Sequence, residues 1–342
     1  MNELIEITDD LSSSWNKFVL NNNDSTFSHL YEWKKILNES YLLNSQYYGI
    51  IKDSELTAII PLSIVKIPFF KSEAYSLPFL GSAGIIKNDK CDSYRLNNSL
   101  FQLLDNLKVN TIENRRLDRT SIKSDIDYYT PILSLSDDSS LLWDKLDSKV
   151  RNQVRKAQKL GLNVTWGVDQ IDQFYKIYSK NMYDLGSPVH SKMFFQKIIM
   201  HLKRNVNILC IRINSKVIAS MILFTFRNTI SNPWASSDRE YLSYCPNMLM
   251  YWEAVRFGCE NGFTEFDFGR SHANSGTYKF KLQWGAKPIP LFYDIFSREK
   301  DLTKPGILKY RSKKAELFST LWKAIPYKLT LWLGPKIRKM IP

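Results

Sequence analysis

The sequence predicts an α/β (α+β) protein built from two copies of one unit, and three observations carry this prediction. The chain has 342 residues, a length that favours two domains over one. Hydrophobic residues make up 44% of it, enough to form packed cores. The third observation is a repeated order of elements, because helices precede a β-hairpin in each half of the chain.

The repeat is clearest at the two hairpins. One covers residues 47–65 and turns at Lys52–Glu55, and the other covers 207–226 and turns at Asn214–Lys216. At an offset of 161 and without gaps, Glu55–Ala58 falls on Lys216–Ala219, which indicates two copies of one unit. Apolar residues at helical spacing predict the helices that precede the hairpins: Trp15–Phe18, His29–Leu37, Asp172–Tyr183 and Ser191–Leu202.

Capping residues predict two more helices, and these helices with the basic C-terminal segment suggest the limits of the domains. A helix capped by Ser148 and ended by Gly161 joins the two units, and a later helix runs from Pro246 to Gly262. A strand, FTEFDFG, follows that helix. We therefore expect a first domain at 1–140, a second at 141–296, and a basic amphipathic C-terminal tail at 297–342.

The formal net charge of +13 favours phosphates, nucleic acid, acidic glycans or lipid headgroups as partners. Twelve Lys/Arg against three Asp/Glu place +9 of this charge in residues 297–342. Trp322, Tyr327, Trp332 and Leu333 interrupt the basic residues, a composition suited to the surface of an anionic membrane leaflet. A basic tail packed on the protein body explains the same pattern, and the two interpretations are compatible.

Cysteine and histidine spacing predicts neither a metal site nor a bound cofactor, because the four residues of each type are scattered. The N-terminal segment MNELIEITDD is acidic and unlike a signal peptide, and no apolar run reaches the roughly 18 residues that span a bilayer. We expect a cytoplasmic protein, with contact at the inner face of the plasma membrane if the tail binds lipid.

The joining helix carries a basic stripe at i, i+4 and i+8, formed by Arg151, Arg155 and Lys159. Like charges at this spacing repel one another. A stripe without carboxylates therefore suggests a bound phosphate, while a solvated helix face is the alternative.

Four motifs follow one another over nearly the whole chain: STFSHLYEWKKIL, SKVRNQVRKAQKLG, PNMLMYWEAVRFGCENG and EFDFGRSHANSGTYKFKLQWG. Together they resemble the Fem-type aminoacyltransferase superfamily, which builds peptidoglycan cross-bridges. The tail, with W-K-x-[IL]-P and L-G-P, resembles the FemAB-related branch associated with exopolysaccharide and PEP-CTERM/exosortase gene clusters. The resemblance implies two tandem GNAT-like acyltransferase domains, each a mixed central sheet flanked by helices, plus a C-terminal helical tail. In this family the last segment can return to the first domain.

Acyl transfer to an amine needs donors for a carbonyl oxygen that becomes negative and a proton for the leaving group. Lys281, which matches the family's F-K-x-x-[FW]-G lysine, is the candidate for stabilising negative charge. Asp267 is a base, an amine anchor or a structural partner of Arg270, and Tyr278 is a candidate proton donor. If 279–283 is a strand, Lys279 and Lys281 face one cleft. The candidates for substrate binding are Arg270, Lys279, Arg151, Arg155, Trp234, Asp238 and Asn247.

The expected partners follow from this chemistry. The donor is an activated acyl group on aminoacyl-tRNA, acyl carrier protein or acyl-CoA, and the acceptor is an amine on an envelope, peptidoglycan or polysaccharide precursor that can be lipid-linked. The helix beginning at Pro246 has no glycine-rich loop before it, which favours the first two donors over free acetyl-CoA. A degenerate GNAT pair that only binds anionic glycan or nucleic acid is the alternative.

Overall fold

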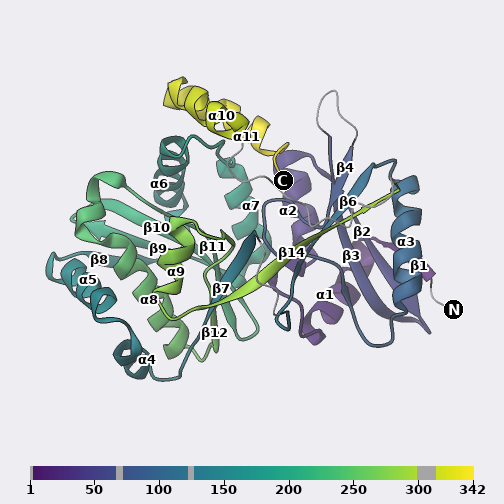
Figure 1. Ribbon diagram of the computed structural model, residues 1–342, viewed down its shortest axis with the longest axis horizontal. Coiled ribbons are helices and arrows are strands. Elements are labelled where there is room, and N and C mark those ends of the chain that lie inside the picture. The colour runs from purple at the N-terminus through teal and green to yellow at the C-terminus, as the bar shows by residue number, and fades with distance from the viewer. Residues whose placement is uncertain (1–2, 67–71, 122–126, 299–312) are drawn as a thin grey trace. The chain divides into compact units, whose positions relative to one another are not determined.

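The computed structural model describes residues 3–66, 72–121, 127–298 and 313–342, which form two compact units. The first unit contains Met1–Asp127, Pro290–Lys309 and Lys336–Pro342, and the second contains Tyr128–Ile289 and Tyr310–Pro335. Helices flank a sheet in each unit (Figure 1). The predicted fold, with a mixed sheet and flanking helices in each half, is confirmed.

The first unit is built on a sheet in which β1 (Glu3–Ile7), β2 (Asn44–Lys52), β3 (Glu55–Val65) and β4 (Glu73–Tyr75) pair in antiparallel order. Next to β4 lies the parallel strand β6 (Thr111–Leu117), and β14 (Lys287–Ser297) pairs antiparallel with β6 from Leu291 onward. A short strand, β5 (Ile86–Lys87), pairs with β3.

Helices cover both faces of this sheet. The helix α3 (Ser93–Asn106) buries Leu96, Leu100 and Leu103 with Ile50 and Ile60 of the strands. The other face receives α1 (Ser12–Asn21) and α2 (Glu32–Tyr41), where Trp15 stacks on Tyr47 with ring centroids 4.8 Å apart. Successive residues of a strand point to opposite faces, so β2 serves both layers.

The second unit has the same topology. Its strands β8 (Asn163–Trp166), β9 (Val206–Ile213), β10 (Lys216–Phe226) and β11 (Thr229–Ser237) pair in antiparallel order. The strand β12 (Glu265–Asp267) runs parallel to β11, and β7 (Tyr128–Ser134) pairs antiparallel with β12. A two-residue strand, β13 (Ser271–His272), extends β7.

The helices of the second unit follow the same plan. A helix crosses between the parallel strands β11 and β12, as such connections require: this is α8 (Pro246–Glu260). It packs with α5 (Ser148–Lys159) against Leu209 and Leu223 in the larger hydrophobic core. The opposite face is covered by α6 (Ile171–Asp184) and α7 (Lys192–Leu202). A short helix, α4 (Ser139–Lys145), precedes α5.

The predicted repeat is confirmed at the hairpins, since β3 and β10 begin at Glu55 and Lys216, 161 residues apart. Both turns use left-handed residues, with φ of 52° at Asp53 and 52° at Asn214. The joining helix begins at Ser148 as predicted, but Asp147 caps it by accepting a hydrogen bond from the Lys149 amide at 2.7 Å. Gly161 ends it with φ of 71°.

Each unit includes one strand that directly follows the other unit in the sequence. The limits of the units therefore differ from the domain boundaries expected at 140 and 296. The strand β7 follows β6 in sequence but pairs with β12, and β14 follows the second unit but pairs with β6. The tail forms α10 (Lys313–Ala324) and α11 (Tyr327–Arg338), and Tyr310–Pro335 belongs to the second unit. Residues 299–312 of the predicted tail lie outside the described residues.

Candidate active site

The segment predicted as a strand of alternating aromatics and lysines is a helix, α9 (Gly276–Leu282). The Ser275 hydroxyl caps it by accepting a hydrogen bond from the Tyr278 amide at 3.1 Å. In this helix Lys279 is exposed, whereas Lys281 is 8% exposed. The prediction that both lysines face one cleft is therefore wrong, because a helix separates positions that a strand would align.

Lys281 is buried against the turn that follows β12. Its Nζ atom donates to the carbonyl oxygen of Gly269 at 2.8 Å and to that of Arg270 at 3.3 Å. Burial lowers the pKa of Lys281 to about 7, with the Asp267 carboxylate opposing and the Arg270 guanidinium adding to this shift. An ammonium has three N–H donors, so two backbone carbonyls leave one donor for another oxygen.

Asp267 organises the same turn. Its Oδ1 atom accepts a hydrogen bond from the Thr130 hydroxyl of β7 and another from the Gly269 amide at 2.8 Å. Gly269 has a φ of 74°, and a Cβ atom there would meet the Asn232 carbonyl oxygen of β11 at 2.6 Å. Glycine is therefore required at this position, and the carboxylate holds the backbone that binds Lys281.

Aromatic rings from β7 surround the turn. The Arg270 guanidinium lies over the Tyr128 ring, 5.2 Å from its centroid, and the Tyr278 ring lies 5.6 Å from that of Tyr129. Burial raises the pKa of Tyr278, so its phenol stays protonated at neutral pH. Lys281, Asp267, Tyr278 and Arg270, which the sequence singled out, thus gather around one turn.

The basic stripe of α5 is used partly for packing. Arg155 lies over the Trp143 ring at 5.4 Å, and Arg151 approaches the Asp144 carboxylate at 4.0 Å. Both partners belong to α4, so the stripe ties two helices together. The structure does not bring these arginines into the group around Lys281.

Two further candidates for substrate binding, Trp234 and Asp238, contact other side chains of the second unit. Trp234 packs edge-on against the rings of Phe194 and Phe195 at 5.7 and 5.3 Å. Asp238 caps a short 3-10 helix and pairs with Lys180 at 3.1 Å and Lys216 at 3.4 Å. Burial alone would raise the pKa of Asp238, but hydrogen bonds from Lys180, the Glu240 amide and Lys216, together with the charge of Lys180, outweigh burial and lower the pKa.

Asn247, by contrast, lines a pocket of about 290 Å³ at the N-terminal end of α8. Lys149 and Gln153 of α5 form one wall, and Phe280 and Gln283 from the α9 region form another. In the first turn of α8, Pro246 has no amide hydrogen and the Met248 amide donates to the Cys245 carbonyl oxygen at 3.0 Å. The Asn247 amide and the Lys149 ammonium are the groups that favour an anion here. The pocket therefore suits a phosphate-bearing group, and α9 contributes to it through neighbours of Lys281.

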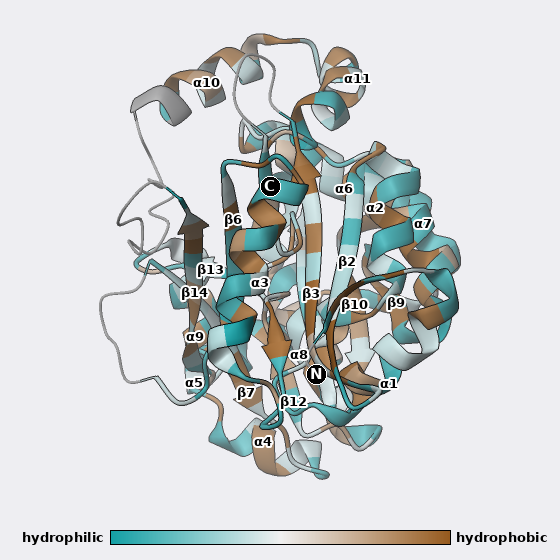
Figure 2. Ribbon diagram, turned by 90° about the vertical axis from the view of Figure 1, so that its right-hand side faces the viewer, coloured by the Kyte–Doolittle hydropathy of each residue, from teal (hydrophilic) through white to brown (hydrophobic). Residues whose placement is uncertain are grey.

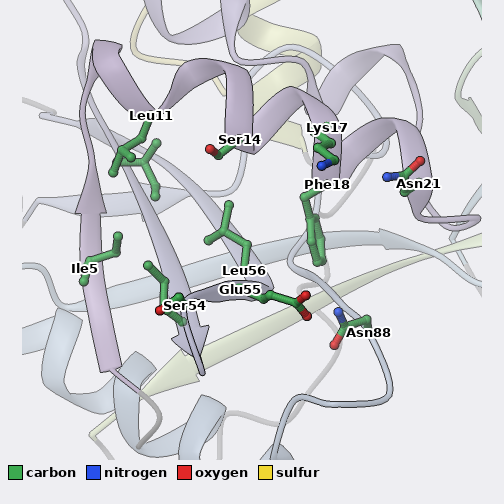
Figure 3. Close-up of a pocket in the computed structure, with 12 residues that line it drawn as sticks. Ile5, Leu11, Ser14, Lys17, Phe18, Asn21, Ser54, Glu55, Leu56 and Asn88 are labelled. Carbon is green, nitrogen blue, oxygen red and sulfur yellow. The ribbon is translucent and has the colours of Figure 1, made fainter.

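The first unit contains a separate pocket of about 390 Å³, between β1, α1 and the turn from β2 to β3 (Figure 3). Its walls are mainly apolar, with Ile5, Leu11 and Phe18 among them, and Ser14, Lys17 and Glu55 supply polar atoms. None of the predicted site residues lines it.

Sequence reasoning missed several residues of the second unit. Thr130, Tyr128 and Tyr129 come from β7, which follows the first unit in the chain and carries no recognisable motif. Gln283 lies within the motif around Lys281, and Lys149 lies within the basic helix, so both could have been found there.

The comparisons with known proteins agree with this geometry. Residues 145–282 match the family model described as an acetyltransferase (GNAT) domain. This segment is similar to a GNAT domain. Lys281, Asp267, Tyr278 and Arg270 lie within the matched residues, whereas Thr130 and Tyr129 of β7 precede them. A search of curated proteins found no match in sequence.

Solved structures extend the GNAT-type fold to most of the chain. FemX is similar at a TM-score of 0.66 with 14% identity, covering 85% of this chain and 96% of FemX. A tandem GNAT protein from the clavulanic acid biosynthesis pathway gives 0.54 with 6% identity, covering 86% and 97%. The C-terminal domain of a putative lysylphosphatidylglycerol synthetase from Agrobacterium fabrum gives 0.52 with 9% identity, covering 92% and 96%. The resemblance to Fem-type GNAT proteins is confirmed, while the exopolysaccharide branch stays a prediction.

Proposed function

We propose that this GNAT protein transfers an aminoacyl or acyl group from an activated donor to an amine of a cell-envelope precursor. The observation that carries the proposal is the pocket at the start of α8, because Asn247, Lys149 and Gln283 line it beside α9. The anionic part of the donor, a phosphate of tRNA, of a carrier-protein arm or of a coenzyme, would bind at this pocket.

The group around Lys281 would act at the reacting end. As an ammonium, Lys281 can offer its third N–H to the oxygen that becomes negative when the amine attacks. Tyr278, whose raised pKa keeps its proton, can protonate the leaving oxygen or sulfur, and its phenolate then takes the proton that the attacking amine loses as the amide bond forms. Asp267 and Thr130 would then be positioning residues, since their hydrogen bonds hold the turn that fixes Lys281.

The acceptor substrate is inferred from the fold and the charge of the tail, whereas the donor is inferred from the pocket. FemX and the lysylphosphatidylglycerol synthetase domain share this fold, and the basic tail suits an anionic or lipid-linked precursor at the inner face of the plasma membrane. An amine on a peptidoglycan or polysaccharide precursor fits the proposed chemistry.

Mass spectrometry of defined reactions tests this function. The purified protein is incubated with an aminoacyl-tRNA, an acyl carrier protein thioester or an acyl-CoA, together with amine-bearing envelope precursors. We expect an added acyl mass with one donor class and its loss in Lys281→Met and in Lys149→Met. Lys287→Met is the matched control, since it removes one exposed ammonium outside the candidate site.

The outcomes separate the two functions that the sequence left open. Tight binding of an anionic glycan or tRNA without product from any donor would favour the binding protein over the enzyme. Full activity in both Lys281→Met and Lys149→Met would reject the site and leave acyl transfer intact.

A further inference from the structure

The tail helices α10 and α11 are firmly packed along one side. Trp322 and Thr330 are each 2% exposed, and the Tyr183 hydroxyl of α6 donates to the Lys323 carbonyl oxygen at 3.0 Å. The hydroxyls of Ser179 and Tyr327 lie 2.8 Å apart. A Cβ atom at Gly186, just after α6, would meet the Ser319 hydroxyl at 2.1 Å, so the helices approach closely. Helix α10 and the first two turns of α11 are therefore packed on the rest of the second unit.

The other side of these helices exposes large apolar side chains. Leu317 and Leu321 are one turn apart on α10 and are 61% and 60% exposed. Leu329 and Trp332 are three residues apart on α11 and are 52% and 62% exposed. Hydrophobic and hydrophilic stretches alternate along both helices (Figure 2). We call these four residues, together with the exposed Lys328, which lies one turn before Trp332, the tail surface.

The charge of this region has one sign. Residues 313–342 include seven Lys/Arg and one acidic residue, Glu316. Leucine and tryptophan enter the boundary between headgroups and acyl chains, while lysines reach anionic headgroups. Apolar and cationic side chains on one docked element thus match the two layers of an anionic bilayer surface.

The tail surface meets a bilayer without crossing it. None of the helices within the described residues has the length and hydrophobicity needed to cross a membrane. Pro326 separates α10 from α11, and lysines interrupt the apolar residues of both. The chemistry is that of shallow insertion parallel to the surface.

We propose that the tail surface binds the surface of an anionic lipid bilayer. Leu321 and Trp332 enter the headgroup boundary, and Lys328 contacts anionic headgroups. This binding depends on α10 and α11 and requires no acyl transfer.

Co-sedimentation of the full chain with vesicles tests the proposal. One set of vesicles contains equal parts phosphatidylglycerol and phosphatidylcholine, and the other contains phosphatidylcholine alone. We expect the protein to pellet with the anionic set, and the double variant Leu321→Asp/Trp332→Asp to lose binding by about tenfold or more. Met200→Asp is the matched control, because Met200 is 57% exposed on α7, outside the tail.

Charge is tested separately from apolar contact. Lys328→Glu should weaken binding to the anionic vesicles by roughly tenfold or more. Lys203→Glu changes the net charge by the same amount at an exposed position after α7 and should weaken binding much less. Circular dichroism of every variant verifies that the fold is retained.

Each remaining outcome overturns the proposal. Pelleting of Leu321→Asp/Trp332→Asp like the original chain would remove the tail surface from the contact. Equal binding to both vesicle sets would remove the anionic requirement. Absence of vesicle binding would leave the surface to a protein partner. Acyl transfer to a water-soluble acceptor is measured without vesicles, so failure there is distinguishable from failure of membrane binding.

Discussion

The Nζ atom of Lys281 in α9 donates a hydrogen bond at 2.8 Å to the carbonyl oxygen of Gly269, which lies twelve positions earlier in the chain, in the turn after β12. This bond connects the lysine near the end of the motif EFDFGRSHANSGTYKFKLQWG to the glycine near its start. The sequence shows only that the two residues are near each other in the chain. The Asp267 carboxylate binds the Gly269 amide, so one peptide turn is held on both sides. The geometry of the candidate active site therefore depends on this turn.

Gly269→Ala should destabilise the second unit strongly. The new Cβ atom would meet the Asn232 carbonyl oxygen at 2.6 Å in a backbone with φ of 74°. We expect a loss of about 2 kcal/mol or more in the free energy of unfolding, measured by urea denaturation. Gly262→Ala is the matched control: its φ is 75° but nothing lies within 4 Å, so about 1 kcal/mol is expected. Equal losses in the two variants would contradict the close approach to β11.

Thr130→Val keeps the shape of the side chain and removes the hydroxyl that binds Asp267. The carboxylate then loses a partly buried donor, which costs about 1–2 kcal/mol of unfolding free energy. Thr229→Val removes a longer bond to Glu265, 3.3 Å, from the same sheet and should change stability by less than about 0.5 kcal/mol. Thermal unfolding of both variants makes the comparison. A Thr130 variant as stable as the control would contradict the role of this bond.

Lys281 should make stability depend on pH in the alkaline range. Its pKa is lowered from 10.5 to about 7 in the folded protein, so between these values the unfolded chain binds one proton more. The free energy of unfolding should therefore gain from this group as pH rises from about 7 to about 10.5, and Lys281→Met should lack this gain. Denaturant titrations at several pH values measure the difference. Parallel curves for the two proteins would mean that Lys281 is not desolvated.

The lowered pKa of Lys281 also predicts how the rate of acyl transfer depends on pH, with a decline (an alkaline limb) above about pH 7. If Lys281 acts as an ammonium, kcat/KM should fall as pH rises through about 7, the pKa of Lys281 in the free protein. Arginine keeps its charge at that pH, so this alkaline limb should disappear in Lys281→Arg even if the rate is low. An unchanged limb in this variant would assign the titration to another group.

Asp238→Asn should weaken the second unit at neutral pH. It removes a buried carboxylate that pairs with Lys180 and Lys216, and we expect a loss of about 1–3 kcal/mol. The lowered pKa of Asp238 means that its contribution is present above its ordinary value, 3.8, and is lost as pH falls through the folded pKa. The stabilities of the two proteins should converge in acid, as unfolding at pH 7 and at pH 3 would show. A constant difference would rule out the ion pairs as its cause.

Much of the fold was readable from local pattern. The polar turns between apolar runs gave the hairpins at Glu55 and Lys216, and Pro246 and Gly262 marked α8. The site residues Lys281, Asp267, Tyr278 and Arg270 were found through their motifs. Their partners Thr130 and Tyr129 were not, because β7 reaches them by pairing with a strand 131 or more residues away in the chain.

By itself, the sequence determined the paired α/β units and most helix ends, because apolar period, caps and turn residues act over a few positions. Only the tertiary structure decided that 276–282 is a helix, that β7 and β14 exchange places, and that Lys281 is buried while Lys279 is exposed. Those outcomes depend on contacts between segments distant in the chain, and desolvation of an ammonium exists only once such segments close around it.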